Sequence, residues 1–172
     1  KKYPGQVTYP APPDFTGSAF VRNIIYEFVD PETFMEMEAD KETVRAAIES
    51  ALDYLRQLNP YLWKQGQSFP ATVAQQETMY MDGELLLPMR YESYWIATAI
   101  EKGMCSPTSR SFLFEGGTIG NTNYLAVARN APNKAGALVA INEMLSPEVQ
   151  ASRYEELKIL PVLDTQVLSP EE

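Results

Sequence analysis

Apolar residues recur every three or four positions in two long stretches of the chain, residues 19–29 and 40–58. This spacing places them on one face of a helix, so both stretches are predicted helices. Asp40 is a suitable N-cap for the second helix, and Asn59-Pro60 ends it. Further helices are predicted over residues 71–81, 92–102, 132–145 and 147–157, which are bounded by residues that stop or start helices.

Short apolar runs between these helices predict strands over residues 6–9, 84–89, 112–114 and 122–128. In the last run both alternating faces are apolar, with Tyr124 on one face and Leu125 on the other, as in a strand covered on both sides. Strands that alternate with helices indicate an α/β fold with helices against a central, mostly parallel sheet. Since no linker divides the chain, residues 1–172 are predicted to form one domain.

The charge and the rare residue types exclude several function classes. A net charge of −9 argues against nucleic acid as a partner, because nucleic-acid binding depends on Lys and Arg that neutralise phosphates. Histidine is absent and Cys105 is the single cysteine, so no imidazole base and no His/Cys metal cluster is available. Phosphate-binding loops and nucleophile elbows are also missing from the sequence. We therefore predict no enzymatic activity, no metal and no cofactor.

The start of the chain suggests a piece of a longer protein. It opens on Lys1-Lys2 without methionine, no apolar signal segment follows, and no run approaches the ~20 apolar residues that span a bilayer.

Two segments that precede predicted helices carry candidate ligand-binding residues. Asp14, Thr16, Gly17 and Ser18 place hydroxyls and free amide groups at a helix N-terminus, which attracts anions and polar ligand atoms. The alternative is simple helix capping. Residues 90–93 (Arg-Tyr-Glu-Ser) follow the apolar run 84–89, where ligands of open α/β sheets collect.

Within residues 90–93, Tyr91 and Glu92 are the candidates. Their alternative roles are packing for Tyr91 and a favourable helix-start charge for Glu92.

Two further groups of candidates lie in predicted loops and turns. Asn121, Thr122 and Tyr124 follow a glycine-rich turn and combine amide, hydroxyl and aromatic groups, as small-molecule pockets do. Asn and Thr also commonly satisfy the backbone of turns, which is the competing interpretation. Trp63 in the loop 61–68 is the aromatic candidate for holding a cation or stacking a ring, with simple packing as its alternative.

The sequence of residues 116–150, together with residues 9–20, resembles the second half of extracytoplasmic solute-binding proteins of ABC importers. The similar branch includes thiamine-, polyamine- and iron-binding members, and the resemblance covers residues 7–164. It implies a single lobe, the second, of a type II periplasmic-binding-protein fold, with residues 158–172 returning towards a missing first lobe. Iron-binding members present adjacent tyrosines, whereas Tyr124 here has no tyrosine neighbour, which disfavours iron.

The resemblance also implies a function. Such proteins trap a small solute between two lobes by hinge closure and deliver it to a membrane permease, in the periplasm or outside the membrane on a lipid anchor. The acidic balance and the aromatics suit a thiamine-like or other organic cation, whereas the helix start at Thr16 suits an anion. Two alternatives remain open: an enzyme that uses carboxylates such as Glu92 and Asp14, and a ligand-sensing regulatory domain on the same fold.

Overall fold

A small parallel sheet joins two distant parts of the chain in the computed structural model, which describes residues 2–92, 94–164 and 166. Strand β1 (Val7–Thr8) pairs with β2 (Leu87–Pro88), with Val7 opposite Leu87. The parallel pairing agrees with the sequence, but β2 is much shorter than the predicted run 84–89. Pro88 has no amide hydrogen and so cannot extend the ladder.

Helices α1 (Phe15–Phe28) and α4 (Glu49–Leu58) form the main apolar core. Ile24 of α1 packs with Ala51 and Leu55 of α4, and the rings of Phe28 and Tyr54 lie 5.4 Å apart. Helix α1 begins four residues before its predicted start, because Asp14 rather than residues 16–18 provides the cap.

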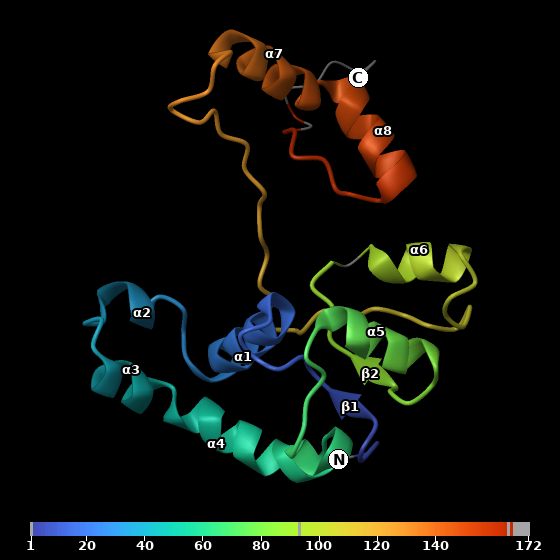
Figure 1. Ribbon diagram of the computed structural model, residues 1–172. Coiled ribbons are helices and arrows are strands. Elements are labelled where there is room, and N and C mark those ends of the chain that lie inside the picture. The colour runs from blue at the N-terminus through green and yellow to red at the C-terminus, as the bar shows by residue number, and fades with distance from the viewer. Residues whose placement is uncertain (1, 93, 165, 167–172) are drawn as a thin grey trace.

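The predicted helix 40–58 is two helices in the structure. Helix α3 (Lys41–Ala47) ends at Ile48, whose backbone angles (φ −96°, ψ 3°) leave the helical range, and α4 follows at an angle. The predicted cap is confirmed, since the Asp40 carboxylate accepts the Glu42 and Thr43 amides at 3.0 Å each. A further short helix, α2 (Thr33–Glu36), was not predicted. Helices α2 and α3 lie together at the far end of α4 (Figure 1).

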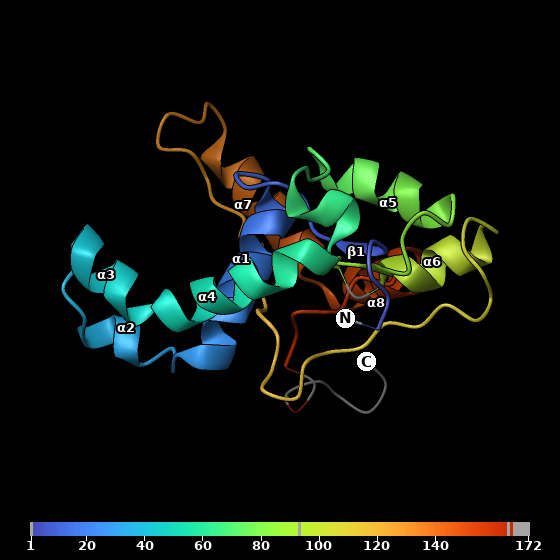
Figure 2. The ribbon, with the colours of Figure 1, turned by 90° about the horizontal axis from the view of Figure 1, so that it is seen from below.

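Helix α5 (Val73–Met81) lies beside β2, and α6 (Trp95–Glu101) follows in the chain (Figures 1 and 2). Thr72 caps α5 through its hydroxyl, so this predicted helix is confirmed apart from its first two residues. Helix α6 is shorter than the predicted 92–102. The predicted loop 61–68 begins at the end of a 3₁₀ turn, η1 (Asn59–Tyr61), and contains a second tight turn, η2 (Trp63–Gly66), in which Lys64 and Gln65 have left-handed backbone angles.

The predicted strands 112–114 and 122–128 are irregular, extended segments in the structure. Leu125 is 52% exposed and Tyr124 is 87% exposed, against the expectation of a strand covered on both sides. A strand requires a neighbour for its backbone hydrogen bonds, and within the described residues no strand pairs with either segment. The alternating pattern predicts which faces are apolar but supplies no partner.

The extended segment leads to α7 (Lys134–Met144) and α8 (Pro147–Leu157), which contact each other and stand away from the other helices (Figure 1). Helix α8 has the predicted bounds. Buried Gln150 holds the pair together, since its amide donates to the Met144 carbonyl and its oxygen accepts the Val162 amide. Of the predicted return segment 158–172, residues 165 and 167–172 lie outside the described residues.

Candidate functional site

Two of the predicted ligand-binding segments meet at one edge of the small sheet. In a parallel pair the carboxyl ends of both strands lie at the same edge. The chain leaves β1 towards the start of α1 and leaves β2 towards residues 90–92. The two paths touch, since the rings of Phe15 and Tyr91 lie 5.1 Å apart in an edge-to-face arrangement. This edge is where open α/β sheets collect ligands, and it is the candidate site.

The N-terminus of α1 is built around Asp14. One oxygen of its carboxylate accepts the amides of Thr16 at 2.9 Å and Gly17 at 3.0 Å, and its carbonyl accepts the Ser18 amide at 2.8 Å. Asp14 is thus the helix cap, and the amides of Thr16, Gly17 and Ser18 already have partners. Thr16 and Gly17 are buried, whereas Ser18 is half-buried. Direct contact of these residues with a ligand stays a prediction.

Gly17 has a steric role that the sequence did not reveal. A Cβ atom at this position would lie 1.9 Å from the carbonyl oxygen of Pro10. Pro10 is itself buried, and the next residue, Ala11, donates its amide to the Pro70 carbonyl at 2.8 Å. The segment after β1 therefore passes directly against the first turn of α1, and only glycine permits this approach.

The turn after β2 is organised by an arginine between two carboxylates. The Arg90 guanidinium forms an ion pair with Glu77 of α5 and a second one with Glu92, whose oxygen lies 2.8 Å from the arginine Nε. It also lies 5.5 Å from the ring centre of Trp95, within cation–π range. Glu92, a predicted ligand residue, is consequently held by Arg90.

Helix α5 contacts this turn through a second residue. Gln76 is completely buried, and its side-chain amide donates to the Met89 carbonyl at 2.6 Å. Consecutive residues of α5 thus hold consecutive residues of the chain just beyond β2.

Other predicted site residues lie away from this contact. Trp63 donates its indole N–H to Glu84 at 2.6 Å, and Lys64 lies over its ring. Glu84 precedes β2, whereas Tyr91 and Glu92 follow it, so Trp63 lies towards the opposite edge of the sheet. A role for Trp63 in binding stays a prediction.

Asn121, Thr122 and Tyr124 lie on the exposed extended segment. Just before them, the Ile119 amide donates to the side chain of Asn23 at 2.9 Å, which brings this segment alongside α1. Their contact with a ligand also stays a prediction, and Ser93 lies outside the described residues.

Sequence reasoning missed two residues of the site. Phe15 is 58% exposed at the start of α1, where its ring meets Tyr91. One indication in the sequence that Phe15 belongs to the site was its position next to the predicted helix cap. Glu77 had no signal, because its pairing with Arg90 depends on how α5 packs against the turn.

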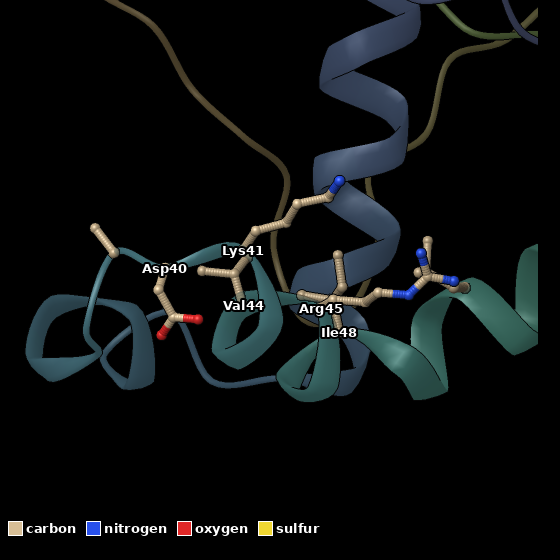
Figure 3. A pocket seen from close by; sticks show the side chains of 7 residues that line it. Asp40, Lys41, Val44, Arg45 and Ile48 are labelled. Carbon is tan, nitrogen blue, oxygen red and sulfur yellow. The ribbon is translucent and has the colours of Figure 1, made fainter.

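Two open hollows lie outside this edge. The first, of about 490 Å³, lies against α3 and the start of α4, with Asp40 at one end and Arg45 towards the other (Figure 3). Hydrogen bonds from Thr43 and then Glu42 lower the pKa of the Asp40 carboxyl below its usual value. The second, of about 450 Å³, is lined by Tyr80, Met104 and Cys105 among others, and burial raises the pKa of the Cys105 thiol.

Within residues 2–92, 94–164 and 166 no group of three or more His, Cys, Asp or Glu side chains is arranged to hold a metal ion. The helices within the same ranges are too short or too polar to cross a bilayer.

Comparison with known proteins gives two matches. A family model described as bacterial extracellular solute-binding protein matches residues 1–171. The chain is also similar to Protein YnjB of Escherichia coli (strain K12), with 35% identity over 156 residues that cover 90% of this chain. The chain spans about 40% of the length of that curated relative. No solved structure matches the chain.

Proposed function

This chain belongs to the family of bacterial extracellular solute-binding proteins, and on that premise we propose that it is the second lobe of a two-lobed protein that serves an ABC importer. The family implies an extracytoplasmic location, a small-molecule ligand and a membrane transporter as partner. In the proposed mechanism, solute bridges two lobes, favours the closed state through contacts with both, and is released to the permease.

The observation that carries the proposal is the meeting of the α1 N-terminus with the turn after β2. Phe15 and Tyr91 touch at the carboxyl edge of a parallel strand pair, the position at which ligands of open α/β sheets bind. Exposed Phe15 offers an aromatic surface, and Glu92, the next residue after Tyr91, offers a carboxylate. Asn121, Thr122 and Tyr124 would complete this wall from the segment that passes alongside α1.

The solute that this arrangement favours is a small organic cation with a planar ring, of which thiamine is one example. A ring stacks on exposed aromatic side chains, and a positive charge is attracted to a carboxylate and to aromatic faces. The net charge of −9 adds a long-range attraction for cations.

The test is a thermal-shift screen of the full-length protein against vitamins, polyamines, sugars and oxyanions, followed by calorimetry on the compounds that stabilise it. A compound present at 100 times its Kd stabilises the folded state by about 2.7 kcal/mol, a shift that the screen detects. We expect an organic cation among the stabilising compounds. A full-length protein that no compound in the panel stabilises would contradict the proposal.

Matched variants locate the site. Glu92→Gln removes the carboxylate at the proposed site, and Phe15→Ala removes the exposed ring. Both are expected to weaken the binding of the stabilising compound at least tenfold, about 1.4 kcal/mol. Glu101→Gln, at the exposed end of α6, is the control and should bind as the unmodified protein does.

A further inference from the structure

We propose that Arg90 is a positioning residue, whose guanidinium fixes the binding turn 90–92 against α5 and is closed to anionic groups of a solute. The inference rests on the proposed function, since it assigns a role and a charge preference within that same site. Its evidence is the pairing of Arg90 with Glu77 and Glu92.

The first step is the attachment of the turn to α5. Gln76 holds Met89 through its carbonyl, and Glu77 holds Arg90 through its guanidinium. Because the adjacent helix residues Gln76 and Glu77 bind the adjacent residues Met89 and Arg90, the direction of the backbone at the start of the turn is fixed. Tyr91 comes next and meets Phe15, so the position of its ring follows from these two contacts.

The second step concerns the carboxylates that already surround the Arg90 guanidinium. The Arg90 guanidinium already faces two carboxylates: Glu77 lies at Nη1, and an oxygen of Glu92 lies 2.8 Å from Nε. These contacts are ion pairs, since the buried Nε has no hydrogen-bond partner, and the guanidinium carbon lies 5.5 Å from the centre of the Trp95 ring. Two negative charges exceed its single positive charge, so an incoming anion meets repulsion rather than a free cation.

The exposure of the three charged side chains indicates which of them a solute meets. The Glu77 side chain is 18% exposed, Arg90 26% and Glu92 38%. The most accessible charge of the turn is therefore a carboxylate. A solute that reaches this turn encounters an acceptor for cations and hydrogen-bond donors, and Arg90 acts through Glu92 and Tyr91.

The test follows the Arg90 Nε–H resonance and the Phe15–Tyr91 ring contact by NMR on the full chain, with inorganic phosphate as the anionic probe. In the unmodified chain we expect a distinct, protected Nε–H signal that excess phosphate leaves unshifted. Glu77→Gln is expected to broaden this signal and to weaken the Phe15–Tyr91 contact. The Phe28–Tyr54 ring contact between α1 and α4 should persist and report that these two helices remain packed in the variant.

Two further variants complete the design. Glu49→Gln removes a carboxylate from the exposed pair with Arg56 on α4 and should leave both signals of the turn unchanged. Arg90→Lys keeps the charge but lacks the fork, so it should lose the Phe15–Tyr91 contact as Glu77→Gln does. A phosphate-induced shift in the unmodified chain, or a Phe15–Tyr91 contact that survives both Glu77→Gln and Arg90→Lys, would overturn the proposal.

These measurements need no natural solute. A negative compound screen would therefore contradict the proposed function while the Arg90 result stands. Conversely, a screen that finds a stabilising cation together with a phosphate-responsive Arg90 would overturn the Arg90 proposal and leave the proposed function standing.

Discussion

Replacing Gly17 by alanine separates two opposing expectations about the start of α1. Intrinsic helix propensity favours alanine over glycine by about 1 kcal/mol within a helix. The structure predicts the opposite sign, since the added Cβ would lie 1.9 Å from the Pro10 carbonyl oxygen and 2.7 Å from its carbonyl carbon. Both neighbours are backbone atoms, so no side-chain rotation relieves the contact.

The magnitude follows from what must move. To reach even the tightest Cβ contact distance, about 3.0 Å, the helix and the Pro10 segment must separate by about 1 Å. Pro10 is buried, and the neighbouring Ala11 amide is bonded to the Pro70 carbonyl, so this separation disturbs packing on both sides. Overpacking costs about 1–3 kcal/mol, and a clash between backbone atoms that no side-chain rotation relieves belongs to the upper part of that range, about 2–3 kcal/mol, which exceeds the propensity gain. We therefore expect a net loss of roughly 1–2 kcal/mol in the free energy of unfolding.

The assay is urea unfolding of the chain, followed by far-ultraviolet circular dichroism. With typical urea dependences of about 1–3 kcal/mol per molar, the midpoint should fall by on the order of 1 M. Gly120→Ala is the matched control, because a Cβ there meets no atom within 4 Å. It should leave the midpoint nearly unchanged. A Gly17→Ala midpoint equal to or above that of the unmodified chain would refute the steric argument.

Three further predictions concern single side chains. Burial raises the pKa of the Cys105 thiol, so iodoacetamide should modify it with a pH midpoint above the ordinary 9.0, and a midpoint at or below that value would contradict its burial. The pKa of Asp40 is lowered in the folded chain, so its cap stabilises α3 at higher pH and is lost as the pH falls below 3.8. NMR titration of the Thr43 amide should show this loss, and the Asp40→Asn variant should show no such pH-dependent change. Asn133→Ala removes the cap of α7 and should cost about 1 kcal/mol, seen as roughly fivefold faster amide exchange in its first turn, whereas Asn142→Ala should not.

The sequence predicted the start of a helix correctly where residues next to that start determine it. Ser146-Pro147 fixes the start of α8 because the serine side chain caps the helix and proline fits its first turn. Asp40 fixes the start of α3 in the same way. The start of α1 was misplaced because Thr16-Gly17-Ser18 has the composition of a cap, whereas the glycine is required by the approach of Pro10. That approach is tertiary and leaves no trace in the local pattern.

The candidate site shows the same division between local and tertiary information. The position of Tyr91 and Glu92 after an apolar run was enough to place them at the carboxyl edge of the sheet. The partners of that turn were not predictable, because Gln76 and Glu77 reach it only through the packing of α5. Charged residues on a helix usually indicate a solvated face, and only the structure shows that Glu77 is largely buried against Arg90.

The segment 122–128 shows how an alternating apolar pattern can predict a wrong element. A strand covered on both sides was expected, yet Leu125 is 52% exposed and the backbone has no strand partner within the described residues. Exposed apolar side chains are unfavourable in water, and the backbone amides of this extended segment remain available to pair with another strand. The chain spans about 40% of the length of its curated relative. If the proposed two-lobed protein is correct, strands from the rest of that protein are the natural partners. Amide exchange in residues 122–128 should then be slower in the full-length protein than in this chain, and equal exchange rates would argue against that pairing.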